Sequence, residues 1–288
     1  MATHTLDWTW EGADVTLGME AAGGGCSVVL LPALSSISTR GEMRPLMDRL
    51  APAFHATTID WPGFGDRPRP RVDWTPRVLS AFLDDALHQI AQPPHAVVAA
   101  GHAATYALHQ AVERPGTIDR LVLIAPTWRG PLPTMMGGQR PWFAPIRAAF
   151  DMPMLGSALY RLNVSRPILD KMVKGHVYSD PEWLAGDRLA EKRAVVRAPG
   201  ARHASVRFVS GGLDPVTSRV SFLDLARRVR VPILVVYGEE TPLKSRADMA
   251  ALAELPGVET RRLDHGKLAV HEAFPEAVAN AIAPFLNE

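Results

Sequence analysis

The chain has 288 residues, with 31 Lys and Arg against 30 Asp and Glu, so its formal net charge is +1. This balance gives no indication of a nucleic-acid or acidic-membrane partner. The single cysteine, Cys26, excludes an internal disulfide and fits a reducing, cytoplasmic compartment. Residues 1–12 lack the basic start and apolar run of a secretion signal, and no apolar run approaches the ~18 residues of a membrane-spanning helix.

The first sixty residues alternate short apolar runs with an amphipathic stretch. Residues 6–10 and 15–21 predict two strands of a hairpin. The continuous apolar run 27–33 predicts a strand that is buried on both faces. A helix over 39–53 and a strand over 55–61 follow.

The same alternation continues to residue 126 and returns near the C-terminus. Residues 75–91 predict an amphipathic helix with one apolar face. After it, the pattern predicts a strand at 95–101, a helix at 104–116 and a strand at 118–126, and later strands at 231–238 and 258–264 before a closing helix at 272–288.

Strands that alternate with helices predict an α/β fold whose mostly parallel sheet is covered by helices on both faces. Residues 127–205 break this rhythm, because prolines and aromatic residues interrupt short helical patterns there. No polar linker flanks them. We therefore predict a core of residues 1–126 and 206–288, with residues 127–205 as a helical lid inserted over the sheet.

Three segments carry a family resemblance. Residues 30–36 (LLPALSS) end one strand, 60–70 (DWPGFGDRPRP) follow another, and 101–105 (GHAAT) follow a third; residues 272–286 match a closing helix. In this order and spacing they resemble the α/β-hydrolase superfamily over nearly the whole chain, and most closely its lid-bearing esterases, dehalogenases and proline iminopeptidases. The resemblance implies a sheet of about eight strands.

The family places a nucleophilic serine on the turn between strand and helix, where one side chain is exposed. Ala103 stands at the centre of this turn, so the resemblance implies that the nucleophile position is vacant. The resemblance implies that the backbone N–H groups of Ala104 and Leu34 form an oxyanion hole. The alternative is that Ala103 only packs in the core at the strand end.

The other two positions of the Ser-Asp-His triad also depart from the family. Thr241 stands where the acid is usual, and Glu240, one residue earlier, is the candidate substitute. Lys267 stands where histidine is usual, and His265 is the candidate base if the loop shifts. The sequence thus predicts a degenerate triad.

The predicted pocket is lined by residues beside the turn and by aromatic side chains of the lid. Histidine spacing indicates no metal site, and no glycine-rich loop indicates a nucleotide cofactor, so we expect no cofactor. The pocket residues, besides Leu34 and Ala104, are Ser35, His102, Trp128, Trp142, Phe143 and Tyr160.

These features predict a protein with a lidded pocket for a small, largely apolar acyl- or ester-like molecule, and not an ordinary serine esterase. If it is an enzyme, water-assisted hydrolysis or a lyase or oxygenase reaction, with His265 or Lys267 as base, needs no serine. Two alternatives stay open: a working hydrolase with an engineered serine-to-alanine change at Ala103, and a non-catalytic binder or scaffold.

Overall fold

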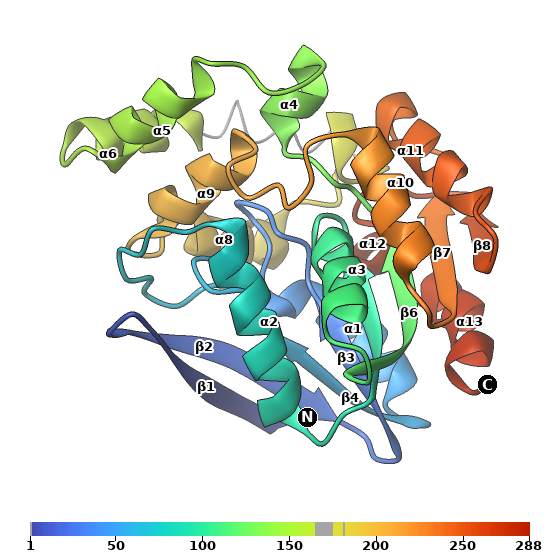
Figure 1. The fold of residues 1–288 in the computed structure, drawn as a ribbon. Helices are drawn as coiled ribbons and strands as arrows, with labels where there is room; N and C mark the ends of the chain where they lie inside the picture. The colour runs from blue at the N-terminus through green and yellow to red at the C-terminus, as the bar shows by residue number, and fades with distance from the viewer. Residues whose placement is uncertain (1, 165–174, 181) are drawn as a thin grey trace.

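The computed structural model describes residues 2–164, 175–180 and 182–288. Its centre is an eight-stranded sheet with the order β1-β2-β4-β3-β5-β6-β7-β8 (Figure 1). β2 runs antiparallel to β1 and β4, and the pairings from β4 and β3 through to β8 are parallel. The strands are β1 (Ala2–Trp10), β2 (Ala13–Ala22), β3 (Cys26–Leu31), β4 (Phe54–Ile59), β5 (His95–Ala100), β6 (Ile118–Ile124), β7 (Ile233–Gly238) and β8 (Val258–Leu263). The predicted fold class and the hairpin at the sheet edge are confirmed.

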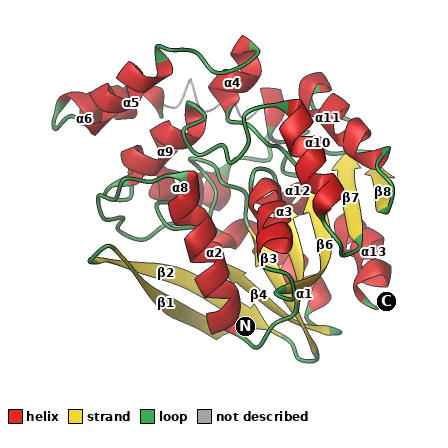
Figure 2. Ribbon diagram, in the orientation of Figure 1, coloured by secondary structure: helices red, strands yellow, loops and turns green. Residues whose placement is uncertain are grey.

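Helices cover both faces of this sheet (Figure 2). One face carries η1 (Arg40–Met43), α1 (Arg44–Leu50), α12 (Val270–Ala273) and α13 (Pro275–Leu286). The other carries α2 (Pro76–Ile90), α3 (Ala103–Glu113), α10 (Arg219–Arg228) and α11 (Leu243–Ala253). The continuous apolar runs of β5 and β7 are buried at every residue, as strands between two helical layers require.

The edge hairpin joins the core through its alternating apolar face. In β1, Leu6 and Trp8 are buried while their neighbours are exposed. The Trp8 ring meets the Phe82 ring of α2 edge-on, with 5.4 Å between centroids, and its indole N–H donates to Asp85 at 2.8 Å. Aromatic packing therefore fixes the hairpin against α2, and the indole N–H of Trp8 has a hydrogen-bond partner.

Between β6 and β7 the chain forms α4 (Pro131–Met136), α5 (Phe143–Asp151), α6 (Leu155–Asn163), α8 (Gly186–Arg197) and α9 (Ala201–Val209). This segment packs on loops that follow the carboxyl ends of strands (Figure 1). Arg69 N–H donates to Pro199 O at 2.9 Å, and Ala269 N–H donates to Val177 O at 3.1 Å. Ala204 of α9 is part of the main hydrophobic core, so the described part of this segment shares the core of the sheet.

Candidate active site

β5 passes into α3 through a sharp turn whose tip is Gly101. Its φ of +52° lies in the left-handed region, which favours glycine, and a Cβ at this position would lie 3.2 Å from the Cβ of Ala33. Two backbone hydrogen bonds fix the turn: Gly101 N–H donates to Ile124 O at 2.9 Å, and Thr127 N–H donates to Gly101 O at 3.0 Å. The turn therefore presents a position without a side chain.

Ala103 lies two residues beyond this tip. It is the first residue of α3, its exposure is 0%, and it belongs to the hydrophobic core. The N–H of Ala104 donates to Gly101 O at 3.3 Å within the first turn of the helix. Ala103 therefore packs in the core at the start of α3, as in the alternative left open by the sequence, and the amide of Ala104 has a partner within the helix. β5 ends at Ala100, so the left-handed turn falls at Gly101.

The loop after β3 lies beside the tip. Ala33 N–H donates to Glu42 Oε1 at 2.7 Å, which ties the loop to η1. Ser35 Oγ accepts the N–H of Ile37 at 3.2 Å, so this hydroxyl stabilises a turn. The side chain of Leu34 is buried in the core, and only its backbone remains to serve the oxyanion role that the resemblance implies.

The loops after β7 and β8 bring the remaining candidates together. Thr241 is buried, and its hydroxyl has no hydrogen-bond partner among the described residues. Glu240 accepts the N–H of Gly266 at 3.2 Å, and its carboxylate lies 3.9 Å from Nδ1 of His265. The His265 side chain is 70% exposed, so this Glu240–His265 pair lies at the surface. Lys267 is half-buried in the loop that leads to α12.

The comparisons identify the family. The model of the alpha/beta hydrolase family matches residues 28–281. The chain belongs to the α/β-hydrolase family.

Solved structures with the same fold are distant in sequence. The chain is 18% identical to a serine hydrolase involved in carbazole degradation, with a TM-score of 0.73 over 99% of both chains. It is 17% identical to the haloalkane dehalogenase DbeA from Bradyrhizobium elkani, with a TM-score of 0.72 over 99% of this chain and 98% of that one. It is 21% identical to Cfl2 from Burkholderia cenocepacia, with a TM-score of 0.73 over 99% of this chain and 96% of that one. No curated protein sequence matches. At these identities the likeness shows the fold alone.

The aromatic side chains expected to wall the pocket of this α/β-hydrolase have different surroundings. Trp128 is buried against Phe222, and its indole N–H donates to Asp248 of α11 at 2.8 Å. Trp142 is 44% exposed and packs edge-on against the buried Phe143. Tyr160 lines a groove between α6, α8 and α9. Sequence patterns reveal that such residues are apolar but not which way each side chain faces.

His102 faces away from the turn into a buried polar contact that sequence reasoning missed. Its Nε2 lies 3.2 Å from Leu213 O and 3.4 Å from Asp214 Oδ1, and its ring meets Phe208 edge-on. Asp214 also accepts the N–H of Gly130 at 2.9 Å. Burial lowers the pKa of His102 to about 4 and raises the pKa of Asp214 to about 7. Both groups are therefore held in their neutral forms over the mildly acidic range.

These opposite shifts predict a measurable pH effect. The raised pKa of Asp214 makes the folded state lose stability as pH rises from about 4 to 7, whereas the lowered pKa of His102 makes it gain stability between about 4 and 6.5. The two slopes largely cancel. In Asp214→Asn only the His102 slope remains, so we expect its free energy of unfolding to rise by about 2 kcal/mol, relative to the native chain, between pH 4.5 and 6.5.

Urea denaturation at pH 4.5, 5.5 and 6.5 measures this difference. Asp224→Asn is the control, because Asp224 forms an exposed ion pair with Arg227. Parallel pH profiles for Asp214→Asn and the native chain would contradict the assignment of neutral buried forms.

A second buried cluster joins α8 to both the loop beside the tip and α12. Lys192 Nζ lies 3.0 Å from Glu272 Oε1 and 3.7 Å from Glu42 Oε2. His271 Nε2 lies 3.4 Å from Glu42 Oε1, and Tyr178 OH donates to Glu272 at 2.6 Å. His271 of α12 therefore lies beside the carboxylate of Glu42.

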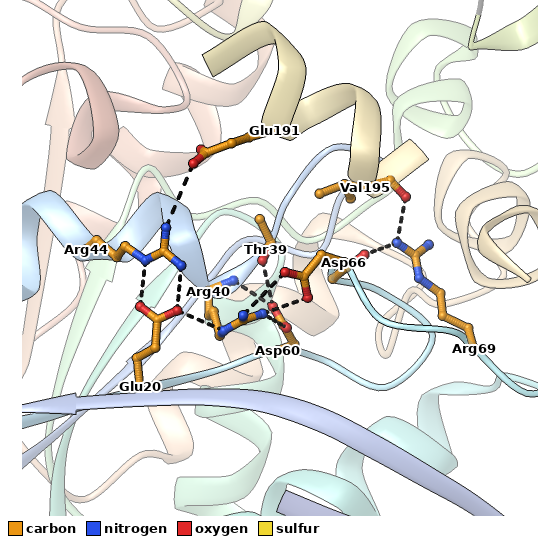
Figure 3. A network of polar contacts seen from close by, with 10 residues as sticks. Glu20, Thr39, Arg40, Arg44, Asp60, Asp66, Arg69, Glu191 and Val195 are labelled. Carbon is orange, nitrogen blue, oxygen red and sulfur yellow. Dashed lines mark hydrogen bonds and ion pairs between the residues drawn. The ribbon is translucent and has the colours of Figure 1, made fainter. Parts of the chain in front are cut away.

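A third network surrounds Arg40 (Figure 3). Its guanidinium donates to Glu20 at 3.0 Å, Asp60 at 2.5 Å and Asp66 at 2.8 Å. Glu20, on β2, also accepts from Arg44 at 2.6 Å. Asp66 lies in the loop after β4, and its carboxylate is paired with Arg40. The network holds the loops after β3 and β4 together.

No group of three or more His, Cys, Asp or Glu side chains suited to a metal ion occurs within residues 2–164, 175–180 and 182–288. Over the same residues, no helix is long and apolar enough to cross a membrane.

Proposed function

We propose that this chain is a lidded, ligand-binding α/β-hydrolase that does not use a serine nucleophile, and that its ligand is a small, largely apolar acyl- or ester-like molecule. The observation that carries the proposal is Gly101. An acyl-enzyme requires a hydroxyl or thiol at the tip of the turn, and glycine offers none. Residues 127–205, whose described helices pack over the strand ends, are the proposed lid.

The loops after β7 and β8 support the same proposal. Thr241 cannot orient a base as a carboxylate does, and Lys267 replaces the histidine that would take a serine's proton. Glu240 and His265 lie 3.9 Å apart, but their exposure leaves them in water, where a relay is weak. These departures at two further positions support the proposal that the triad is degenerate.

The second candidate is an enzyme that acts without a nucleophile. The observation that favours it is the geometry around the tip: α3 starts directly behind Gly101, and a helix N-terminus stabilises negative charge. The N-terminus of α3, the Leu34 amide as a second donor and Lys267 as base together support water-assisted hydrolysis or proton abstraction.

Fluorophosphonate labelling and an ester panel test the proposal. We expect the native chain to remain unlabelled, and to be stabilised thermally by members of an aryl- and acyl-ester panel without releasing product. Any residual turnover should stay within the roughly 10³–10⁴-fold over water that a site without its nucleophile retains. Labelling of the native chain, or ester hydrolysis at an ordinary enzymatic rate, would contradict the proposal.

A matched pair of variants tests which residue lies at the tip of the turn. Each carries Thr241→Asp and Lys267→His; one adds Gly101→Ser and the other Ala103→Ser. We expect labelling of the Gly101→Ser version only, because position 103 is enclosed in the core. Labelling of the Ala103→Ser version would place the tip at Ala103 after all.

A further inference from the structure

A groove of about 610 Å³ lies between α6, α8 and α9, and its lining is strongly basic. Four arginines from these three helices converge on it, and no acidic residue is among the lining residues that the structure describes. The described lining otherwise consists of two hydroxyl groups and a mostly aliphatic wall. The arginines are Arg161, Arg193, Arg197 and Arg202.

These arginines are unusual for their lack of counter-ions. Arg161, Arg193 and Arg197 form no ion pair or hydrogen bond within the part of the chain that the structure describes. Arg202 donates to the neutral Ser157 Oγ at 2.7 Å, and its buried Nε has no partner there. Arg207, one helical turn and a half beyond Arg202 on α9, is by contrast paired with Asp151. Guanidinium groups that are gathered without acidic partners repel one another, and a bound anion would offset this repulsion.

A fifth arginine lies behind the groove. Arg69 is buried and contacts the turn at Gly200, which lines the groove. It donates to Gly65 O and to Val195 O, and its Nε and Nη1 have no hydrogen-bond partner among the described residues (Figure 3). Burial without a paired carboxylate lowers its pKa to about 10. Its charge adds to the positive potential of the groove wall.

We propose that this groove binds a small molecule that carries a diphosphate group. Guanidinium groups form paired, charge-assisted hydrogen bonds to phosphate oxygens, and several of them offset the multiple charge of a diphosphate. Gly200 caps α9 at the edge of the groove, so the helix N-terminus adds favourable dipoles. The apolar wall, which includes Leu189 and Val196, suits an uncharged remainder of the ligand. This site goes beyond the proposed function, because it shares no residue with the turn at Gly101.

Isothermal titration calorimetry with inorganic pyrophosphate, ADP and adenosine tests this site. We expect pyrophosphate and ADP to bind with a Kd below about 1 mM, and adenosine not to bind measurably. Arg193→Gln/Arg197→Gln should weaken both by about tenfold or more, since each lost guanidinium contact to a phosphate costs a charge-assisted hydrogen bond. Neither arginine is buried, so the fold of this variant is not at risk.

Arg227→Gln/Arg228→Gln is the matched control. It removes the same charge from α10, outside the groove, and should leave both Kd values unchanged. Equal weakening in the two variants would mean that only overall charge attracts the anions, and would overturn the site. Absence of saturable binding by pyrophosphate and ADP up to about 10 mM would also overturn it. Binding of adenosine as tight as that of ADP would overturn the proposal that the groove recognises the diphosphate group.

Discussion

Replacing Arg40 with methionine is expected to lower the free energy of unfolding by about 3–5 kcal/mol, the cost of leaving buried charges without their partner. Arg40 contacts three carboxylates, and the side chains of Glu20 and Asp60 are 0% and 2% exposed. Arg44 still compensates Glu20 in the variant. Asp60 loses its cation and has no comparable replacement, so most of the loss arises there.

The loss should depend on pH. Burial raises the pKa of Asp60, and the charge of Arg40 opposes this effect. Without Arg40 the pKa of Asp60 rises further. The folded state then keeps this carboxyl neutral at low pH, and its buried charge lowers the free energy of unfolding only as pH increases. The deficit of Arg40→Met relative to the native chain should therefore be smaller at pH 4.5 than at pH 8.

Chemical denaturation of three variants checks both statements. Arg114→Met is the control, because its pair with Asp84 is exposed and worth less than about 1 kcal/mol. Arg40→Met/Asp60→Asn should recover part of the loss at pH 8, since it removes the stranded charge. A loss for Arg40→Met no larger than that for Arg114→Met would contradict the role of the network.

The fold was predictable because its signals are local. Continuous apolar runs such as 27–33 and 95–101 can only be strands between helical layers, and the alternation in β1 is that of an edge strand with one buried face. The turn at the end of β5 was predicted as an element, but the apolar run does not reveal which residue of the turn adopts the left-handed conformation. In the structure that residue is Gly101.

The buried polar networks were not predictable, because their members lie far apart in sequence. Arg40 and Asp60 are 20 residues apart, and His102 and Asp214 meet across 112 positions. Gly18 belongs to the same arrangement: a Cβ there would lie 2.3 Å from Arg40 Nη1, so glycine makes room for the guanidinium.

Replacing Lys192 with methionine is expected to destabilise the chain by about 3–5 kcal/mol and to loosen α8 first. Its ammonium group is the one cation between Glu42 and Glu272 among the described contacts, and all three side chains are at most 10% exposed. Burial disfavours the charge of Lys192, but the two carboxylates outweigh it and raise its pKa. Without the lysine, two acids remain buried near each other with only His271 beside Glu42.

The position of α8 makes the effect local as well as global. Lys192 is the buried polar link from this helix to η1 and α12, so its loss should raise the hydrogen-exchange rate of residues 186–197 more than that of the core strands β5 and β6. Arg188→Met, on the same helix, is the control: its guanidinium lies 4.4 Å from the Trp183 ring centroid, an exposed contact worth about 0.5–1 kcal/mol.

The double variant Lys192→Met/Glu42→Gln separates charge from packing. If the uncompensated carboxylate causes the loss, neutralising Glu42 should restore about 1–2 kcal/mol, even though it removes the acceptor of Ala33 N–H in its charged form. No recovery, together with unchanged exchange in residues 186–197, would show that Lys192 contributes only its aliphatic stem. If the double variant regains stability, and its α8 amides exchange more slowly than those of Lys192→Met, the buried charge cluster holds the proposed lid to the loop beside Gly101.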